Sequence, residues 1–310
     1  MIHNKSYSIY QELSLLCFEI GLFNLPKQKE LNVKRLKFIA VNPDASSQVI
    51  LNRIISGEYK QGAAQLGFNK KNKLMLTISY SFDSAPIKDL KSSRIMGIDL
   101  GITKVATFSI YDIDSDQYIR TSYKESILDG KELIHFRQKL EARKRSMSIA
   151  SKWASNNKCG HGYKQRTRDA NALNDKVARF RDTYNHKVSR YIVDMAIKYK
   201  CSAIQLEDLS GFNEAQSESL LKNWSYYDLQ QKIVYKANEV GIEVNFINPR
   251  YTSKRCNKCG CIHTENRDCK KDQSKFECIT CGHTDNADIN ASKNIALPNI
   301  EQLIKESLTT

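Results

Sequence analysis

Three absences limit what this chain of 310 residues can be. None of its apolar runs is long enough to cross a membrane; the longest one near the start, residues 13–23, is too short and contains Glu19. That stretch has no cationic segment before it and no small-residue cleavage site after it, so no signal peptide is predicted. The chain also has no internal repeat and no low-complexity tract. With 41% hydrophobic and 26% charged residues, we expect a globular cytoplasmic protein without a membrane segment.

Acidic residues are scarce relative to basic ones. The chain has 34 Asp and Glu against 48 Lys and Arg, a net charge of +14, which favours a polyanionic partner, most often nucleic acid. Residues 131–190 hold 16 of the basic residues and five acidic ones, and apolar residues recur there at helical spacing. We predict a basic helical hairpin over 131–190 that contacts phosphates, although a merely solvated face would show the same pattern. The side chains expected to bind nucleic acid are Arg137, Arg143, Lys144, Arg145, Arg166, Arg168, Arg179 and Arg181.

The order of the other patterns indicates an α/β fold. Residues 1–88 are β-rich and run into a polar, proline-containing stretch. Three strands are predicted within 95–122, before the helical region. Short apolar runs at 203–206 and 243–247 then alternate with further helical patterns. Three strands followed by alternating helices and strands resemble the sheet of a ribonuclease-H-like domain.

Six of the nine cysteines lie between Cys256 and Cys281. Two CxxC pairs, Cys256/Cys259 and Cys278/Cys281, are separated by 18 residues, and a glycine follows each pair. Four thiolates at this spacing are typical of a zinc ribbon in a reducing compartment, with a closed and structural Zn²⁺ site. Weaker candidates nearby, for which no coordination position is left, are Cys261, His263, Cys269 and His283.

Three carboxylates occupy positions where an uncompensated charge would be costly. Asp99 and Glu207 each end an apolar run, and Asp288 starts the last helical pattern. In a ribonuclease-H-like sheet the first and fourth strands are neighbours, so we expect these residues to meet at one sheet edge. Clustered carboxylates need cations to stay ionised, and two Mg²⁺ or Mn²⁺ ions about 3.5–4 Å apart would serve phosphodiester hydrolysis there. Competing ligands at neighbouring positions are Asp208, Asp285 and Asn286.

Several segments resemble one protein family. GIDLGITKVATFSIYD (97–112) looks like the first motif of a RuvC nuclease domain, and AIQLEDLSGF (203–212) looks like the second. NPRYTSKRCNKCG (248–260), followed by FECITCGHTDNADINASKNIA (276–296), looks like the zinc ribbon and the third motif. In this order they resemble the TnpB-type transposon-encoded nucleases and the miniature type V CRISPR effector nucleases.

The resemblance implies an RNA-guided or transposon-associated DNA endonuclease with a two-metal RuvC centre. Asp99, Glu207 and Asp288 would be its catalytic acids, and Arg255 falls where the family has a polar or basic residue near the substrate strand. The implied partners are DNA and a guide RNA, with no membrane, and a homodimer is left open. The resemblance also implies that the protein would read a short DNA flank and that guide pairing would read the remaining sequence.

The resemblance also implies an organisation. Family members begin with a wedge barrel interrupted by a helical recognition lobe, and only the later part of the wedge is matched here. We therefore expect a partial wedge-like domain without that lobe, and a non-cleaving protein that binds guide RNA and DNA is the alternative function. The aromatic residues Trp224, Tyr226 and Tyr227 either stack on bases or pack in the core. The predicted divisions are the wedge-like domain 1–88, the RuvC-like domain 94–248, the zinc ribbon 249–284 and the final RuvC segment 285–310.

Overall fold

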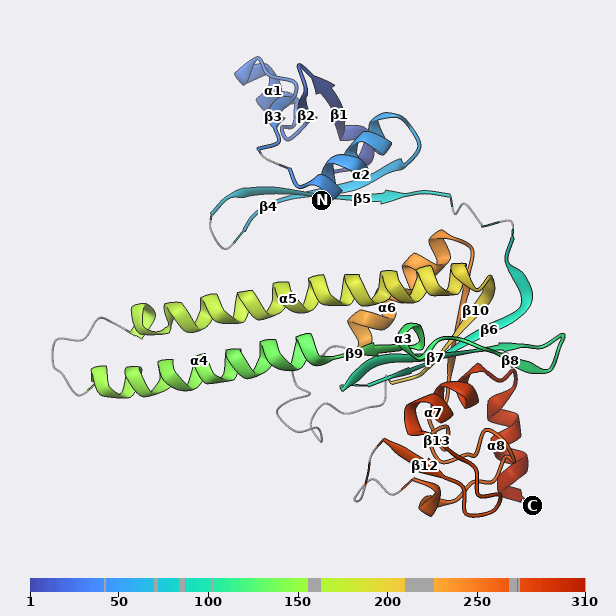
Figure 1. The fold of residues 1–310 in the computed structure, drawn as a ribbon. Coiled ribbons are helices and arrows are strands. Elements are labelled where there is room, and N and C mark those ends of the chain that lie inside the picture. Colours follow the sequence, from blue (N-terminus) through green and yellow to red (C-terminus); the bar gives the residue numbers. More distant parts are fainter. Residues whose placement is uncertain are drawn as a thin grey trace. The chain divides into compact units, whose positions relative to one another are not determined.

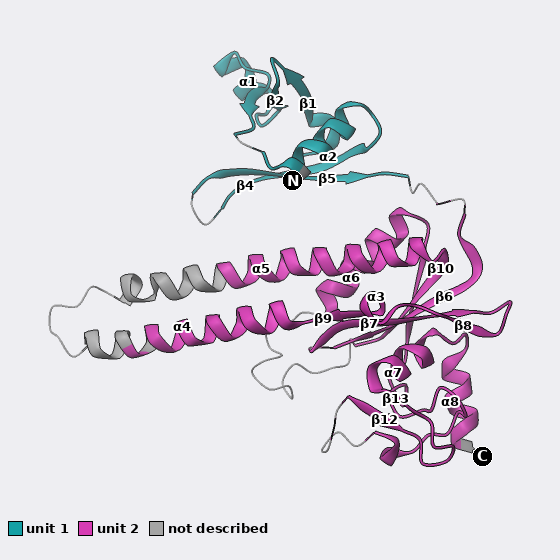
Figure 2. Cartoon of the chain, viewed as in Figure 1, with its two compact units in different colours: residues 1–84 teal, residues 85–310 magenta. Residues whose placement is uncertain are grey.

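The computed structural model divides into two compact units, residues 1–84 and 85–310 (Figure 2). The backbone is described for residues 1–41, 43–69, 72–83, 87, 89–101, 103–155, 163–209, 226–267, 272 and 274–309. Within these ranges the description omits the side chains of 46, 148, 150–175 and 309. Each unit is treated by itself.

The first unit contains two antiparallel sheets. Its strands are β1 (Tyr7–Glu12), β2 (Leu15–Ile20) and β3 (Leu36–Ile39) in one sheet, and β4 (Lys60–Phe68) and β5 (Leu74–Ser81) in the other. Tyr7, Phe18 and Ile20 are buried in its core together with Ala64 of β4, so the two sheets share one apolar centre.

The sequence patterns did not predict the two helices of the first unit, α1 (Leu25–Leu31) and α2 (Ala45–Ile55). Both begin at a side-chain cap. The Asn24 side chain accepts a hydrogen bond from the amide of Lys27, and the Asp44 side chain accepts one from the amide of Ser47. Asn and Asp are preferred N-cap residues, so these two positions carried a signal for the helices.

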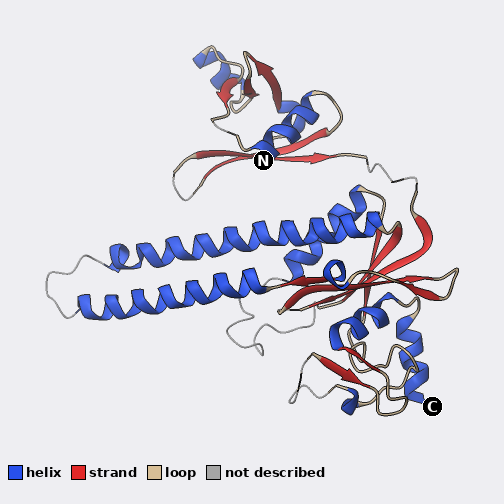
Figure 3. Ribbon diagram, in the orientation of Figure 1, coloured by secondary structure: helices blue, strands red, loops and turns tan. Residues whose placement is uncertain are grey.

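A mixed sheet forms the centre of the second unit (Figure 3). Its strands are β6 (Lys91–Leu100), β7 (Lys104–Asp112), β8 (Gln117–Ile119), β9 (Ile127–Asp129), β10 (Cys201–Glu207) and β11 (Glu243–Ile247). The order across the sheet is β11-β10-β6-β7-β8, and β9 also pairs with β7. β6 is antiparallel to β7 but parallel to β10, which is itself parallel to β11. β6 and β10 are therefore neighbours, as predicted for the first and fourth strands of the domain.

Helices cover both faces of this sheet (Figure 1). They are α3 (Tyr123–Ser126), α4 (Lys131–Ser155), α5 (Tyr163–Lys198), α6 (Tyr226–Glu239), α7 (Ala287–Ala296) and α8 (Ile300–Thr309). One face of the sheet, with Met96 and Ile98 of β6, packs against α5 and α6 in the main core. The long helices α4 and α5 form a hairpin whose inner part is joined by stacking of Phe136 on Phe180, with ring centroids 3.8 Å apart. The sequence patterns did not predict α3 or β9.

The opposite face of the sheet receives α7. Gly97 of β6 is paired with Ser109 of β7 on one side and with Gln205 of β10 on the other. Ser109 Oγ lies 2.7 Å from Ser292 Oγ of α7, and both side chains are buried. A small zinc-ribbon-like segment with β12 (Lys275–Glu277) and β13 (Thr284–Asn286) leads directly into this helix.

Candidate active site and metal centre

Two of the three predicted acids lie side by side at one end of the sheet. β6 and β10 run parallel, and their last paired residues are Ile98 and Leu206. Asp99 and Glu207 follow these residues directly, so both carboxylates leave the sheet at the carboxyl ends of the two strands. Because successive strand residues alternate in direction, Asp99 shares the face of Gly97, on which α7 packs.

The third acid comes from the helix on that face. Asp288 is in the first turn of α7, whose N-cap is Asn286; the Asn286 side chain accepts hydrogen bonds from the amides of Asp288 and Ile289. The cap fixes where the helix begins, and the packing of α7 on β6 fixes where Asp288 lies. Residues that are 81 or more positions apart in the sequence therefore reach one edge of the sheet.

The charge environment of Asp99 includes both of the other predicted acids. Burial raises the pKa of Asp99 to about 8, and the negative charges of Glu207 and Asp288 add to the effect. Burial also raises the pKa of Glu207, against a hydrogen bond of 2.5 Å donated by Thr252 Oγ1. Such raised carboxyl pKa values are expected where acids cluster without enough positive charge.

Two basic residues that the sequence patterns did not single out form ion pairs with Asp288. Lys104 Nζ is 3.1 Å from Asp288 Oδ2, and Arg267 Nη2 is 3.6 Å from Asp288 Oδ1. Lys104 also donates a hydrogen bond of 3.0 Å to Asn286 Oδ1. Both cations lower the pKa of Asp99, though less than burial raises it. Nothing in the local sequence around Arg267 indicates this contact, because it is made across the fold.

The donor set fits hard divalent cations. It consists of carboxylate oxygens, the ligands that Mg²⁺ and Mn²⁺ prefer. Thr107, which is paired with Asp99 across β6 and β7, is buried, and its Oγ1 has no hydrogen-bond partner in the described part of the chain. The acids are less tightly gathered than the cysteines described below, which are the one group of three or more candidate ligands found converging among the described residues.

The competing candidates take other roles. Asp208 is exposed on the residue after β10. Asp285 forms an ion pair of 2.7 Å with Lys293, and Asn286 caps α7. Of the candidate acids, Glu207 and Asp288 are the two whose charges raise the pKa of Asp99.

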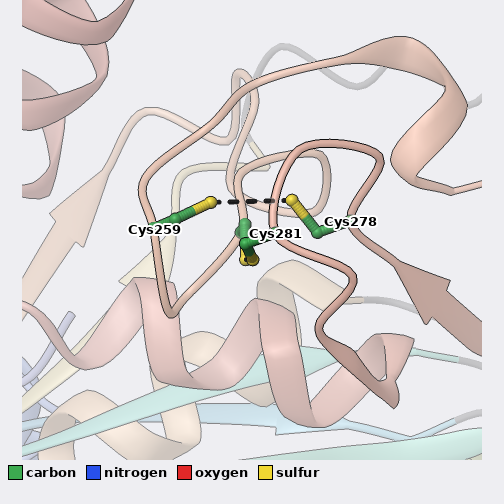
Figure 4. Close-up of side chains that lie close together, drawn as sticks. Cys259, Cys278 and Cys281 are labelled. Carbon is green, nitrogen blue, oxygen red and sulfur yellow. Dashed lines mark hydrogen bonds between the residues drawn. The ribbon is translucent and has the colours of Figure 1, made fainter.

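The four CxxC cysteines converge in the second site. Figure 4 labels three of them, Cys259, Cys278 and Cys281. Their sulfurs all lie within 4.8 Å of one another, with 3.8 Å between Cys256 and Cys281 and 3.6 Å between Cys259 and Cys278. A tetrahedron with metal–sulfur distances of about 2.3 Å has edges of about 3.8 Å, so this group fits a closed four-thiolate site.

Two matching turns build this cluster. The amide of Cys256 donates to the carbonyl of Cys261, and the amide of Cys278 donates to that of His283. In each turn the glycine after the second cysteine has a left-handed backbone, with φ of +76° at Gly260 and +66° at Gly282, which side chains with a Cβ seldom adopt.

The weaker ligand candidates do not join the cluster. Cys261 Sγ accepts a hydrogen bond from Thr280, the His263 ring caps a short 3₁₀ helix, and His283 Nε2 is 3.8 Å from Asp285. Cys269 lies outside the described residues.

The structure separates the predicted nucleic-acid contacts into three groups. On the helical hairpin the exposed ones are Arg143, Lys144, Arg145 and Arg179, and Arg181 is half-buried. The side chains of Arg166 and Arg168 lie outside the described residues, as does Trp224. Tyr226 is partly buried and contacts the main core, whereas Tyr227 is 68% exposed.

Two arginines are not surface residues, contrary to the sequence-based expectation. Arg255 is buried, and its Nη1 donates a hydrogen bond of 2.9 Å to Asn294 of α7. It therefore joins the cysteine segment to α7. Arg137 is buried within the stripe of α4 that also contains Leu133 and Leu140, so it is not part of an exposed phosphate-tracking surface.

Comparison with known proteins places this arrangement in a family. Residues 226–295 match the family described as Cas12f1-like, TNB domain. The CRISPR-associated endodeoxyribonuclease Cas12f1 of Sulfoacidibacillus thermotolerans is 44% identical over 290 residues, which cover 93% of this chain and 65% of that protein. The Cas12f1 of Syntrophomonas palmitatica is 34% identical, with 98% and 66% covered. The chain belongs to the family of TnpB-like proteins and miniature type V CRISPR effectors.

More distant relatives and solved structures agree with this assignment. The putative RNA-guided DNA endonuclease InsQ of Escherichia coli is 28% identical over 222 residues, 66% of this chain and 48% of that protein. A Cas12f1–sgRNA–target DNA complex superposes with a TM-score of 0.69 at 24% identity and covers 94% of this chain and 62% of the other. The expected ribonuclease-H-like α/β fold is thereby confirmed.

The chain spans just under two thirds of the length of the two Cas12f1 relatives.

No helix in the described ranges combines the length and the apolar character that crossing a bilayer requires.

Proposed function

We propose that this chain is a RuvC-type DNA endonuclease that acts with a guide RNA. The observation that supports the proposal is that two neighbouring parallel strands end at Asp99 and Glu207, while Asp288 lies in the first turn of the helix packed on them. Burial and the charges of Glu207 and Asp288 raise the pKa of Asp99. The RNA-guided DNA endonuclease names of the relatives and the RNA and DNA in the similar complex support the same activity. Its place of action would be the cytoplasm.

In this proposal the three carboxylates hold two Mg²⁺ or Mn²⁺ ions. Bound ions would supply an activated water and stabilise the leaving 3′ oxygen during hydrolysis. Thr252 would hold the Glu207 carboxylate in that site, and Lys104 and Arg267 pair with Asp288, where their charges compete with the metal ions. Lys104 and Arg267 also offer positive charge next to the place where a phosphate would bind.

The other parts of the chain would serve binding. The exposed basic side chains of α4 and α5 would contact backbone phosphates, which makes affinity fall with salt. The four cysteines would hold a structural Zn²⁺ and so fix the start of α7. We propose the divisions 1–88, 94–248, 249–284 and 285–310 as wedge-like, RuvC-like, zinc-ribbon and final RuvC segments.

Cleavage of labelled single-stranded DNA tests the nuclease proposal. The purified chain is incubated with the DNA with and without Mg²⁺, beside Asp99→Ala and the exposed control Asp114→Ala. We expect metal-dependent cleavage that is lost in Asp99→Ala and kept in the control. Binding without cleavage, equal in all three proteins, would favour the alternative, a protein that occupies guide RNA and DNA without cutting.

A further inference from the structure

Asn294 of α7 is a fully buried amide that holds one turn of the chain, residues 252–255. Its Nδ2 donates hydrogen bonds to the backbone carbonyl oxygens of Thr252, at 2.9 Å, and of Arg255, at 2.6 Å. Its Oδ1 accepts a hydrogen bond of 2.9 Å from Arg255 Nη1. A buried amide is costly unless it is hydrogen-bonded, so these three bonds fix the turn against α7.

This turn begins at a residue that contacts one of the acids. The buried Thr252 hydroxyl lies 2.5 Å from Glu207 Oε1 and 3.0 Å from the carbonyl oxygen of Pro249. A hydroxyl has one proton, and the shorter contact to a carboxylate is the stronger hydrogen bond. At its other end the turn runs from Arg255 directly into Cys256, the first ligand of the cysteine cluster.

The helix α7 therefore reaches two of the three acids. Asp288 belongs to its first turn, and Asn294, six residues later, reaches Glu207 through Thr252. The same helix packs on β6 and β7. The place of α7 on the sheet thus sets the position of one acid directly and of another through a chain of two hydrogen bonds.

A neighbouring asparagine holds the same segment without reaching the acids. Asn290 lies one turn earlier in α7 and is just as buried. Its Nδ2 donates a hydrogen bond of 2.9 Å to the carbonyl oxygen of Arg255, and its Oδ1 accepts one of 3.0 Å from the amide of Asn257. These bonds secure the cysteine end of the segment, whereas Asn294 also secures the end at Thr252.

We propose that Asn294 is a positioning residue of the acidic centre, which holds Thr252 so that the Glu207 carboxylate is oriented for a divalent cation. The inference deepens the proposed nuclease function and rests on it. Partners that orient a metal ligand commonly change metal affinity by about 10–100-fold when they are lost. Asn294 acts one step further away, through Thr252, and its loss should have a smaller effect of the same sign.

Asn294→Asp is the informative variant. It keeps the side-chain volume and the acceptor for Arg255, and it loses the donor to the Thr252 carbonyl. The added negative charge would by itself favour a cation, so weaker binding cannot come from charge. Mn²⁺ binding to the full chain is measured by electron paramagnetic resonance of the free ion, and only sites that Asp99→Ala loses are counted.

We expect the Kd for Mn²⁺ to rise about 5-fold in Asn294→Asp and about 10-fold in Thr252→Val. Thr252→Ser keeps the hydroxyl and should restore wild-type affinity. The matched control is Asn290→Asp, the same substitution one turn away, which should stay within about 2-fold of the wild type. If Asn294→Asp does not melt cooperatively, the uncharged pair Asn294→Leu and Asn290→Leu takes its place in this comparison.

The double variant separates positioning from a general loss of structure. In a Thr252→Val background, Asn294→Asp should weaken Mn²⁺ binding no further, because the path to Glu207 is already broken. Wild-type affinity in Asn294→Asp, or two losses that multiply in the double variant, would overturn the inference. If instead Asp99→Ala binds Mn²⁺ like the wild type, the acidic metal site is absent, and the inference falls together with the proposed function.

Discussion

Gly97 of β6 lies directly under the backbone of Ala296 in α7. A Cβ built on Gly97 would lie 2.1 Å from the Ala296 nitrogen and 2.5 Å from the carbonyl oxygen of Ser292. Both atoms belong to the helix backbone, so the helix itself would have to move. The absence of a side chain at Gly97 therefore sets the distance between the strand that carries Asp99 and the helix that carries Asp288.

Gly97→Ala is predicted to damage stability and the acidic site together. Forcing a methyl group into this contact should cost at least about 3 kcal/mol of unfolding free energy and displace Asp288 from Asp99. Gly67→Ala is the matched control, because nothing lies within 4 Å of a Cβ at Gly67. Thermal melts and Mg²⁺-dependent cleavage check both variants. Unchanged cleavage by Gly97→Ala would show that α7 can shift without moving the acid.

Removal of the metal from the cysteine cluster should unfold the ribbon. Its small core consists of Cys256, Cys278, Phe276 and Ala287, so two of the expected ligands are also its core residues. We predict one zinc per chain by elemental analysis, a loss of that zinc in Cys256→Ser, and a lower melting temperature after chelation.

Cys261→Ser is the control for the zinc prediction. Cys261 lies next to the cluster but its sulfur accepts a hydrogen bond from Thr280. This variant should keep the zinc. A chain that melts at the same temperature with and without chelator would contradict the role of the metal in holding the ribbon.

Lys104 is predicted to weaken binding of divalent cations. Its ammonium lies 3.1 Å from Asp288 Oδ2, where it repels a dication that approaches the same oxygen. Lys104→Met should therefore lower the Mg²⁺ concentration that gives half-maximal cleavage, by several-fold. Lys293→Met is the control, since Lys293 pairs with Asp285 instead. A higher Mg²⁺ requirement in Lys104→Met would mean that the lysine chiefly holds Asp288 in position.

The relative position of two of the acids could be predicted, because it follows from sheet geometry. Asp99 and Glu207 end apolar runs, and neighbouring parallel strands bring such ends to one edge of a sheet. The cysteine cluster followed from spacing alone, as each CxxC pair is a local turn. Contacts between residues far apart in the sequence could not be predicted. Arg267 meets Asp288 only because the ribbon folds back, and no local pattern records that.

The burial of Arg137 and of Arg255 was missed for different physical reasons. Arg137 could have been placed correctly, because its spacing from Leu133 and Leu140 puts it on the apolar stripe of α4. The count of positive charges concealed this periodicity. Arg255 could not have been placed, since its burial depends on Asn294 in a helix 39 residues away along the sequence.

The buried Lys236 of α6 should make stability depend on pH. Its Nζ donates hydrogen bonds to the backbone carbonyl oxygen of His186, at 2.7 Å, and to the hydroxyl oxygen of Ser189, at 2.6 Å. Neither oxygen carries a charge. Burial lowers the pKa of Lys236 to about 8 from its ordinary value of 10.5, and repulsion from nearby cations adds to this. Between these two pKa values the unfolded chain binds more protons than the folded one, so the unfolding free energy rises with pH there.

Lys236→Met removes this dependence and shows its size. Relative to the variant, the wild type should gain about 1–2 kcal/mol of unfolding free energy between pH 7.5 and 10, measured by denaturant titration at each pH. The exposed Lys124→Met is the control and should track the wild type at both pH values. If wild type and Lys236→Met change in parallel, the Lys236 ammonium keeps its ordinary pKa in the fold. Burying the charged Lys236 side chain of α6 would then cost no stability.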